Sequence, residues 1–125
     1  SFAALLTDLE QRGLLDTTLL VCMGEFGRAP RVARETTFAG AAPGRKHWAA
    51  VYSIVLAGAG VGRGGVFGAL EHIGAYPASH PVGPWDVAAT LFAALGIDPG
   101  GGCTDAVGRT FPITLGEPIS GVYGN

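Results

Sequence analysis

Two segments of the chain carry apolar residues at the spacing of an α-helix, three or four positions apart. The first begins at Phe2 and the second runs from Asp86 to Leu95. Gly13 and Gly96 follow these segments at positions where glycine commonly ends a helix, and Asp86 is a typical N-terminal cap. The pattern therefore predicts one helix near the start of the chain and a second near residue 90.

Two uninterrupted apolar runs, Thr18 to Met23 and Val51 to Ala57, predict strands. Apolar runs without polar alternation are typical of parallel strands that are buried on both faces. Cys22 lies within the first run and is expected to be a small core residue. These strands and helices together predict an α/β fold with a mostly parallel central sheet flanked by helices.

Glycine and proline mark the connections between these elements. Residues 27–47 have no clear period and predict a long loop, which in a compact domain is usually functional or disordered. A literal G-x-G-x-x-G, at Gly60, Gly62 and Gly65, follows the second apolar run. Because no helix is expected after it, a glycine-rich turn or hairpin is favoured over a nucleotide site. The tail from Pro99 is expected to wrap over the fold or to form a short hairpin.

Composition favours a folded domain and excludes several classes of partner. The 125 residues are rich in apolar residues and glycine and carry a formal net charge of −2, which argues against disorder and against attraction to nucleic acid. No apolar run approaches the roughly 20 residues that a membrane span needs. The chain opens on Ser1 inside a predicted helix, so we expect residues 1–125 to be a single partial domain of a longer protein.

Five of the eight lysines and arginines lie in the connection after the first apolar run. They are Arg28, Arg31, Arg34, Arg45 and Lys46, and Glu35 is the single acid among them. A cluster of guanidinium and ammonium groups can bind phosphate, sulfate or carboxylate. A solvated loop that uses charge for solubility would have the same composition, and both interpretations stay open.

Glu25 is a candidate functional residue because it comes directly after a predicted strand, between Gly24 and Gly27. In doubly wound sheets, ligands bind beyond the carboxyl ends of the strands. A carboxylate there can coordinate a cation or act as a base. Alternatively, Glu25 pairs with Arg28 or Arg45 and fixes the loop.

His47 is the second candidate, because it lies just before the second apolar run. The connection between Glu25 and His47 is long enough to bring the two side chains together. A glutamate and a histidine in one pocket form two ligands of a divalent-metal site or one acid–base pair. Two such residues alone do not specify the metal.

The ordered motifs LLVCMGEFGRAP, GRKHW, GAYP and PVGPWDVAATLFAALGIDP resemble the carboxy-terminal part of the DUF1501 family of bacterial proteins. The resemblance extends from about Phe2 to Ile119. That family belongs to the alkaline phosphatase-like and sulfatase-like superfamily, and the resemblance implies the carboxy-terminal part of that fold. The helix from Asp86 to Leu95, with the following Gly96, resembles a structural helix of the superfamily.

The resemblance also implies roles for the corner after the first strand. Glu25 takes the place of the aspartate in a metal-binding Asp-His pair, and Phe26 takes the place of its histidine. His47 resembles a later metal-binding histidine, and Lys46 stands where the family usually has aspartate. The nucleophile and the remaining acidic ligands are expected upstream of Ser1.

Two functions from different classes follow. In the first, the protein is a metal-dependent hydrolase of phosphate or sulfate esters: Glu25 and His47 bind zinc, manganese, calcium or magnesium, and Arg28, Arg45 and Lys46 bind the substrate anion. In the second, the protein is a non-catalytic binding or scaffolding member that keeps the fold. The expected partners are an anionic small-molecule or glycan ester and the remainder of the protein's own chain. The resemblance implies export to the periplasm.

Overall fold

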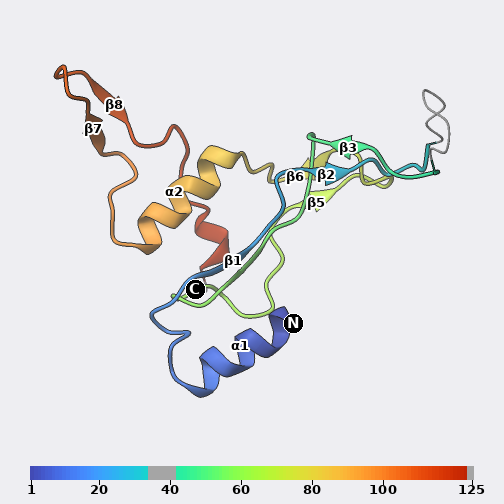
Figure 1. The fold of residues 1–125 in the computed structure, drawn as a ribbon, viewed down its shortest axis with the longest axis horizontal. Helices are drawn as coiled ribbons and strands as arrows, with labels where there is room; N and C mark the ends of the chain where they lie inside the picture. Colours follow the sequence, from blue (N-terminus) through green and yellow to red (C-terminus); the bar gives the residue numbers. More distant parts are fainter. Residues whose placement is uncertain (34–41, 124–125) are drawn as a thin grey trace. The chain divides into compact units, whose positions relative to one another are not determined.

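The computed structural model describes residues 1–33 and 42–123, which fold into short helices and short strands (Figure 1). In chain order the elements are α1 (Phe2–Gln11), β1 (Leu20–Cys22), β2 (Gly27–Arg28), β3 (His47–Trp48), β4 (Val55–Ala57), β5 (Ala69–Leu70), β6 (Pro77–Ser79), α2 (Pro84–Ala94), β7 (Gly102–Thr104), β8 (Thr110–Pro112) and the 3-10 helix η1 (Ser120–Val122). Within these residues, no helix has both the length and the apolar character needed to cross a membrane.

The chain divides into two compact units. Unit 1 combines Ser1–Leu20, Leu56–Phe67 and Val82–Asn125, and unit 2 combines Val21–Val55 and Gly68–Pro81. Unit 1 contains α1, α2, η1 and the β7–β8 hairpin, whereas unit 2 contains the β2–β3 and β5–β6 pairs. Every residue that the sequence singled out for chemistry belongs to unit 2.

The fold is a mixture of helix and strand, as expected, but the prediction of a mostly parallel central sheet is wrong for the described residues. Their strands form two-stranded sheets, and the β2–β3, β5–β6 and β7–β8 pairs are antiparallel. Both apolar runs contain strands, which pair as β1 with β4. A parallel sheet needs cover on both faces, whereas Cys22 and Val55 of these strands are exposed. The prediction that Cys22 is a core residue is therefore also wrong.

Both helices were predicted correctly, with small differences at their ends. Gly13 and Gly96 follow α1 and α2 with φ angles of 68° and 73°, which suit glycine at a helix end. Helix α2 begins earlier than expected, because Gly83 is its N-cap and Pro84 occupies the first helical position, which favours proline. Asp86 is thus the third helical residue, and its Oδ2 accepts a 2.8 Å hydrogen bond from the Gly83 N–H.

The core of unit 1 lies where α2 meets the segment that leads into η1. Val87, Ala89, Thr90 and Ile119 are buried there. The Thr90 hydroxyl donates to the Asp86 carbonyl at 2.7 Å and accepts from the Ile119 N–H at 2.9 Å. Asp86 Oδ1 accepts from the Glu117 N–H at 3.1 Å. The tail therefore does wrap over the fold, and α2 holds it through hydrogen bonds as well as apolar contact.

Two expectations about the glycine-rich connections can be compared with the structure. The G-x-G-x-x-G segment forms turns and an isolated bridge between Val61 and Tyr123, and no helix follows it before β5, which confirms a glycine-rich turn. The long loop predicted over residues 27–47 instead begins with β2 and ends with β3. Its middle, including Arg34 and Glu35, lies outside the described residues.

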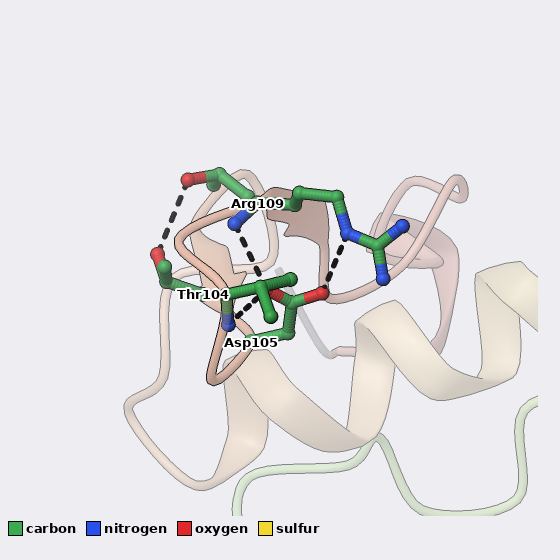
Figure 2. A network of polar contacts seen from close by, with 5 residues as sticks. Thr104, Asp105 and Arg109 are labelled. Carbon is green, nitrogen blue, oxygen red and sulfur yellow. Dashed lines mark hydrogen bonds and ion pairs between the residues drawn. The ribbon is translucent and has the colours of Figure 1, made fainter.

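The β7–β8 pair is the short hairpin expected in the tail, and one carboxylate organises its turn (Figure 2). Asp105 Oδ1 accepts hydrogen bonds from the backbone N–H groups of Arg109 and Val107 at 2.9 and 3.0 Å, and Oδ2 accepts from Arg109 Nε at 2.8 Å. The pKa of Asp105 lies below its ordinary value, chiefly because the Arg109 N–H donates to the carboxylate, with further donation from the guanidinium and from Val107.

We expect acid to loosen this turn. A carboxyl whose pKa is lower in the folded than in the unfolded chain contributes stability above its unfolded pKa of about 3.9, and that contribution disappears as the pH falls through the lower folded value. In an NMR titration, the amide signals of Val107 and Arg109 should shift together, with a midpoint below the pKa of an aspartate in the unfolded chain. Asp105→Asn should abolish this titration, and a midpoint at or above the unfolded value in the unmodified chain would contradict the expectation.

Candidate anion-binding site

The β2–β3 pair brings together the two sequence segments that were predicted to carry chemistry. Gly27 pairs with Trp48, and Arg28 pairs with His47, in an antiparallel register. The strand pair is extended by a hydrogen bond from the Ala29 N–H to the Lys46 carbonyl at 2.8 Å. The residues around Glu25 and those around His47 are therefore cross-strand neighbours, although the sequence left their distance open.

Gly27 allows the backbone of β2 to lie close to the backbone carbonyl groups of Val51 and Trp48. A Cβ atom at residue 27 would overlap the carbonyl oxygen of Val51 and would lie 3.1 Å from that of Trp48. At Gly24 a Cβ would meet its nearest atom, the Phe26 carbonyl oxygen, at 3.6 Å, which is an ordinary contact. Of the two glycines that flank Glu25, Gly27 is therefore the one that the packing requires.

The Phe26 ring contacts two of the residues predicted to bind ligand. Its centroid lies 4.0 Å from that of the His47 ring, with an angle of 31° between the ring planes. The Arg28 guanidinium carbon lies 5.7 Å from the same centroid, within the range of a cation–π contact. The sequence placed Phe26 only at the position of a metal-binding histidine, because stacking across strands depends on a register that the sequence did not predict.

Arg28 also approaches the segment that carries Arg45 and Lys46, just before β3. One of its terminal nitrogens donates to the Arg45 carbonyl oxygen at 3.4 Å, a long and therefore weak hydrogen bond. The backbone contact and the Phe26 ring together place the Arg28 guanidinium beside the Arg45–His47 segment. Of the three predicted anion-binding residues, Arg28 thus lies in β2, and Arg45 and Lys46 lie in the segment that leads into β3.

Trp48 connects this strand pair to the β5–β6 hairpin. Its indole N–H donates to the carbonyl oxygen of Ala75 at 2.7 Å, and its ring meets that of Tyr76 edge to face, with 5.7 Å between centroids. The Ala75 N–H in turn donates to Glu71 Oε1 at 3.0 Å. Because Ala75 is buried, this hydrogen bond holds Trp48, the neighbour of His47 in β3, against the β5–β6 hairpin.

The side chains predicted to meet a ligand are accessible to solvent. Glu25, Arg28, Arg45, Lys46 and His47 are all exposed, whereas Phe26 and Trp48 are partly covered. Arg31 is exposed as well, and Arg34 lies outside the described residues. In residues 1–33 and 42–123, no three or more histidine, cysteine, aspartate or glutamate side chains form a group that could hold a metal ion. The β2–β3 pair and the residues next to it thus carry exposed cationic side chains and one imidazole, and Glu25 lies two residues before β2 in the sequence.

The comparisons with known proteins concern nearly the whole chain. A family model described as "Protein of unknown function (DUF1501)" matches residues 1–122, which include every element from α1 to η1. No curated protein and no solved structure matches the chain significantly. Since the family model covers far more than half of its length, the chain belongs to the DUF1501 family.

Proposed function

We propose that this chain contributes part of a metal-dependent hydrolase of phosphate or sulfate esters, with the alkaline phosphatase-like fold that its ordered motifs resemble. The observation that carries the proposal is the β2–β3 register, which sets Arg28 opposite His47. Glu25 lies just before β2, and Arg45 and Lys46 lie just before β3. The candidate metal ligands and the candidate anion-binding residues therefore lie in this strand pair or within two residues of it.

Arg28, Arg45 and Lys46 would bind the anionic group of the ester. A guanidinium can hold two oxygens of a phosphate or sulfate at once, and an ammonium adds a compact positive charge. Fixed positive charges beside the ester group would also stabilise the negative charge that develops during hydrolysis. The exposure of all three side chains supports this role, because a substrate from solution can reach them.

Glu25 and His47 would hold the divalent cation. Carboxylate oxygen and imidazole nitrogen are ligands that zinc and manganese accept in proteins. The Phe26 ring contacts the His47 ring with 31° between the ring planes, and His47 is exposed, so a cation from solution can approach the imidazole. When bound, the cation would polarise the ester and stabilise the leaving oxygen. Further ligands and the nucleophile would come from outside the described residues.

The Phe26–His47 contact also favours a second candidate function, a non-catalytic anion-binding or scaffolding protein of the same fold. An aromatic ring stacked on a histidine can hold the imidazole as part of the structure, with no metal involved. Phe26 stands at a position that resembles that of a metal-binding histidine in the superfamily. Lys46 stands where the DUF1501 family usually has aspartate. In this alternative the cationic surface binds an anion and leaves it unchanged.

Metal content and hydrolysis separate the two functions. The full-length protein is purified in buffer with zinc or manganese, dialysed, and assayed for metal and for hydrolysis of p-nitrophenyl phosphate and p-nitrophenyl sulfate. The hydrolase should retain stoichiometric metal and release p-nitrophenol, and a Glu25→Gln, His47→Ala double variant should lose both. Retention of phosphate or sulfate by a protein without metal or turnover would support the alternative.

Substitution of Arg28 tests the anion-binding surface on its own. We expect Arg28→Met to weaken binding of inorganic phosphate or sulfate about fivefold, because one exposed charged contact is worth up to about 1 kcal/mol. Binding is measured by isothermal titration at low ionic strength. Arg12→Met removes an exposed arginine that pairs with Asp8 in α1 of unit 1 and serves as the matched control. Equal losses in the two variants would mean that only net charge matters and would contradict a site at β2–β3.

A further inference from the structure

We infer that Phe26 is a positioning residue that orients Arg28 and His47 together for binding of a phosphate or sulfate group. The inference rests on the proposed function of the β2–β3 pair and assigns a role to a residue that has no polar group of its own. Phe26 contacts both side chains, with 4.0 Å between its centroid and that of His47 and 5.7 Å from its centroid to the Arg28 guanidinium carbon. The same Phe26 ring therefore makes both contacts.

The backbone explains why one ring can serve both side chains. Arg28 and His47 are cross-strand partners, and side chains of such pairs in an antiparallel sheet lie about 5 Å apart at Cβ. Phe26 lies in the bend just before β2, and from there its ring reaches both the Arg28 guanidinium and the His47 ring. A planar ring at residue 26 can therefore contact both the guanidinium and the imidazole.

The chemistry of the two side chains explains why their contacts with Phe26 would favour anion binding. An exposed arginine samples many rotamers, and a guanidinium held over an aromatic face samples fewer before it meets an anion. A neutral imidazole keeps its one N–H at the ring edge, where a phosphate or sulfate oxygen can accept it, and its other nitrogen is left to bind the cation. Phe26 thus preorganises two donors and decreases the conformational freedom that would otherwise be lost when the anion binds.

A second arginine in the protein has nearly the same relation to a phenylalanine and supplies a matched control. The Arg109 guanidinium carbon lies 5.6 Å from the centroid of the Phe111 ring in the β7–β8 hairpin. Phe111 is half exposed, at 48%, and the hairpin belongs to unit 1, whereas Phe26 belongs to unit 2. Phe111→Leu therefore removes an equivalent arginine–aromatic contact away from the proposed site.

The test compares inorganic phosphate and sulfate binding in the unmodified protein and in Phe26→Leu, Phe26→Tyr and Phe111→Leu variants by isothermal titration. We expect Phe26→Leu to weaken binding about threefold, as loss of an exposed cation–π contact predicts. Phe26→Tyr, which keeps the aromatic face, and Phe111→Leu should bind as the unmodified protein does. Urea unfolding of each variant checks that the fold is intact.

An independent measurement on the unmodified protein applies even if Phe26→Leu fails to fold. In an NMR titration with phosphate, the ring protons of Phe26 and His47 and the Nε–H of Arg28 should shift together with one dissociation constant. Binding that leaves these three signals unchanged would overturn the inference, as would equal affinities of the unmodified protein and a folded Phe26→Leu variant. Absence of any phosphate or sulfate binding to the unmodified protein would instead refute the proposed function on which the inference rests.

Discussion

Gly27→Ala should destabilise unit 2 and weaken anion binding more than any single change of a charged residue in the site. A Cβ at this position would overlap the carbonyl oxygen of Val51, so the backbone itself would have to move. Overpacking of this kind typically costs about 1–3 kcal/mol, and we expect the upper end because neither partner is a flexible side chain. Since Gly27 pairs with Trp48, its displacement also disturbs the adjacent Arg28–His47 pair.

The measurement combines urea unfolding with phosphate titration. Gly27→Ala should lower the free energy of unfolding by about 3 kcal/mol and decrease phosphate affinity at least about tenfold. Gly24→Ala is the control in the same segment, because its Cβ would meet its nearest atom at 3.6 Å. It should change stability and affinity only slightly. If Gly27→Ala behaved like Gly24→Ala, the close approach of the chain at residue 27 would be contradicted.

Thr90→Val should destabilise unit 1 although the two side chains have nearly the same shape. Thr90 is almost fully buried, with 1% of its surface exposed, and its hydroxyl accepts the Ile119 N–H while it donates to the Asp86 carbonyl. Valine cannot accept that hydrogen bond, so the buried Ile119 N–H would lose its partner. An unsatisfied buried donor costs about 1–3 kcal/mol, and we expect a loss of about 2 kcal/mol in the free energy of unfolding.

Thr90→Ser separates the hydroxyl from the methyl group. Serine keeps both hydrogen bonds and loses one buried methyl, which costs about 1 kcal/mol. Unfolding in urea, followed by circular dichroism of the helices, should therefore give the order unmodified, Thr90→Ser, Thr90→Val from most to least stable. A valine variant as stable as the serine variant would mean that the hydroxyl contributes little to the attachment of the tail.

The helices could be predicted from sequence because their signals are local. Apolar spacing and the glycines after each helix lie within the segments themselves, and α1 and α2 were identified for this reason. Asp86 was assigned to the N-cap, whereas its carboxylate lies one turn further in and also accepts from the Glu117 N–H. That second partner is distant in sequence, and no local pattern indicates it.

The strands were harder to predict because an apolar run gives neither the partner nor the direction of a strand. The runs around Val21 and Leu56 suggested buried parallel strands, but the structure pairs the described strands two by two and leaves much of them accessible. In the candidate site, sequence identified Glu25, His47 and the cations as residue types suited to an anionic ester. It could not predict the Phe26–His47 stacking, which depends on cross-strand register.

The attachment of α2 to the tail has a consequence for how the chain folds during synthesis. Ile119 and Glu117 donate to residues 29 and 31 positions earlier in the chain, and unit 1 is assembled from three separate segments with unit 2 between them. Contacts between residues so far apart in sequence require the intervening chain to close a long loop. Loop closure costs conformational entropy, and such contacts therefore slow folding. Residue 119 therefore has to leave the ribosome before α2 can form its hydrogen bonds to the tail. The β2–β3 pair of unit 2 can form while the last segment of unit 1 is still being translated.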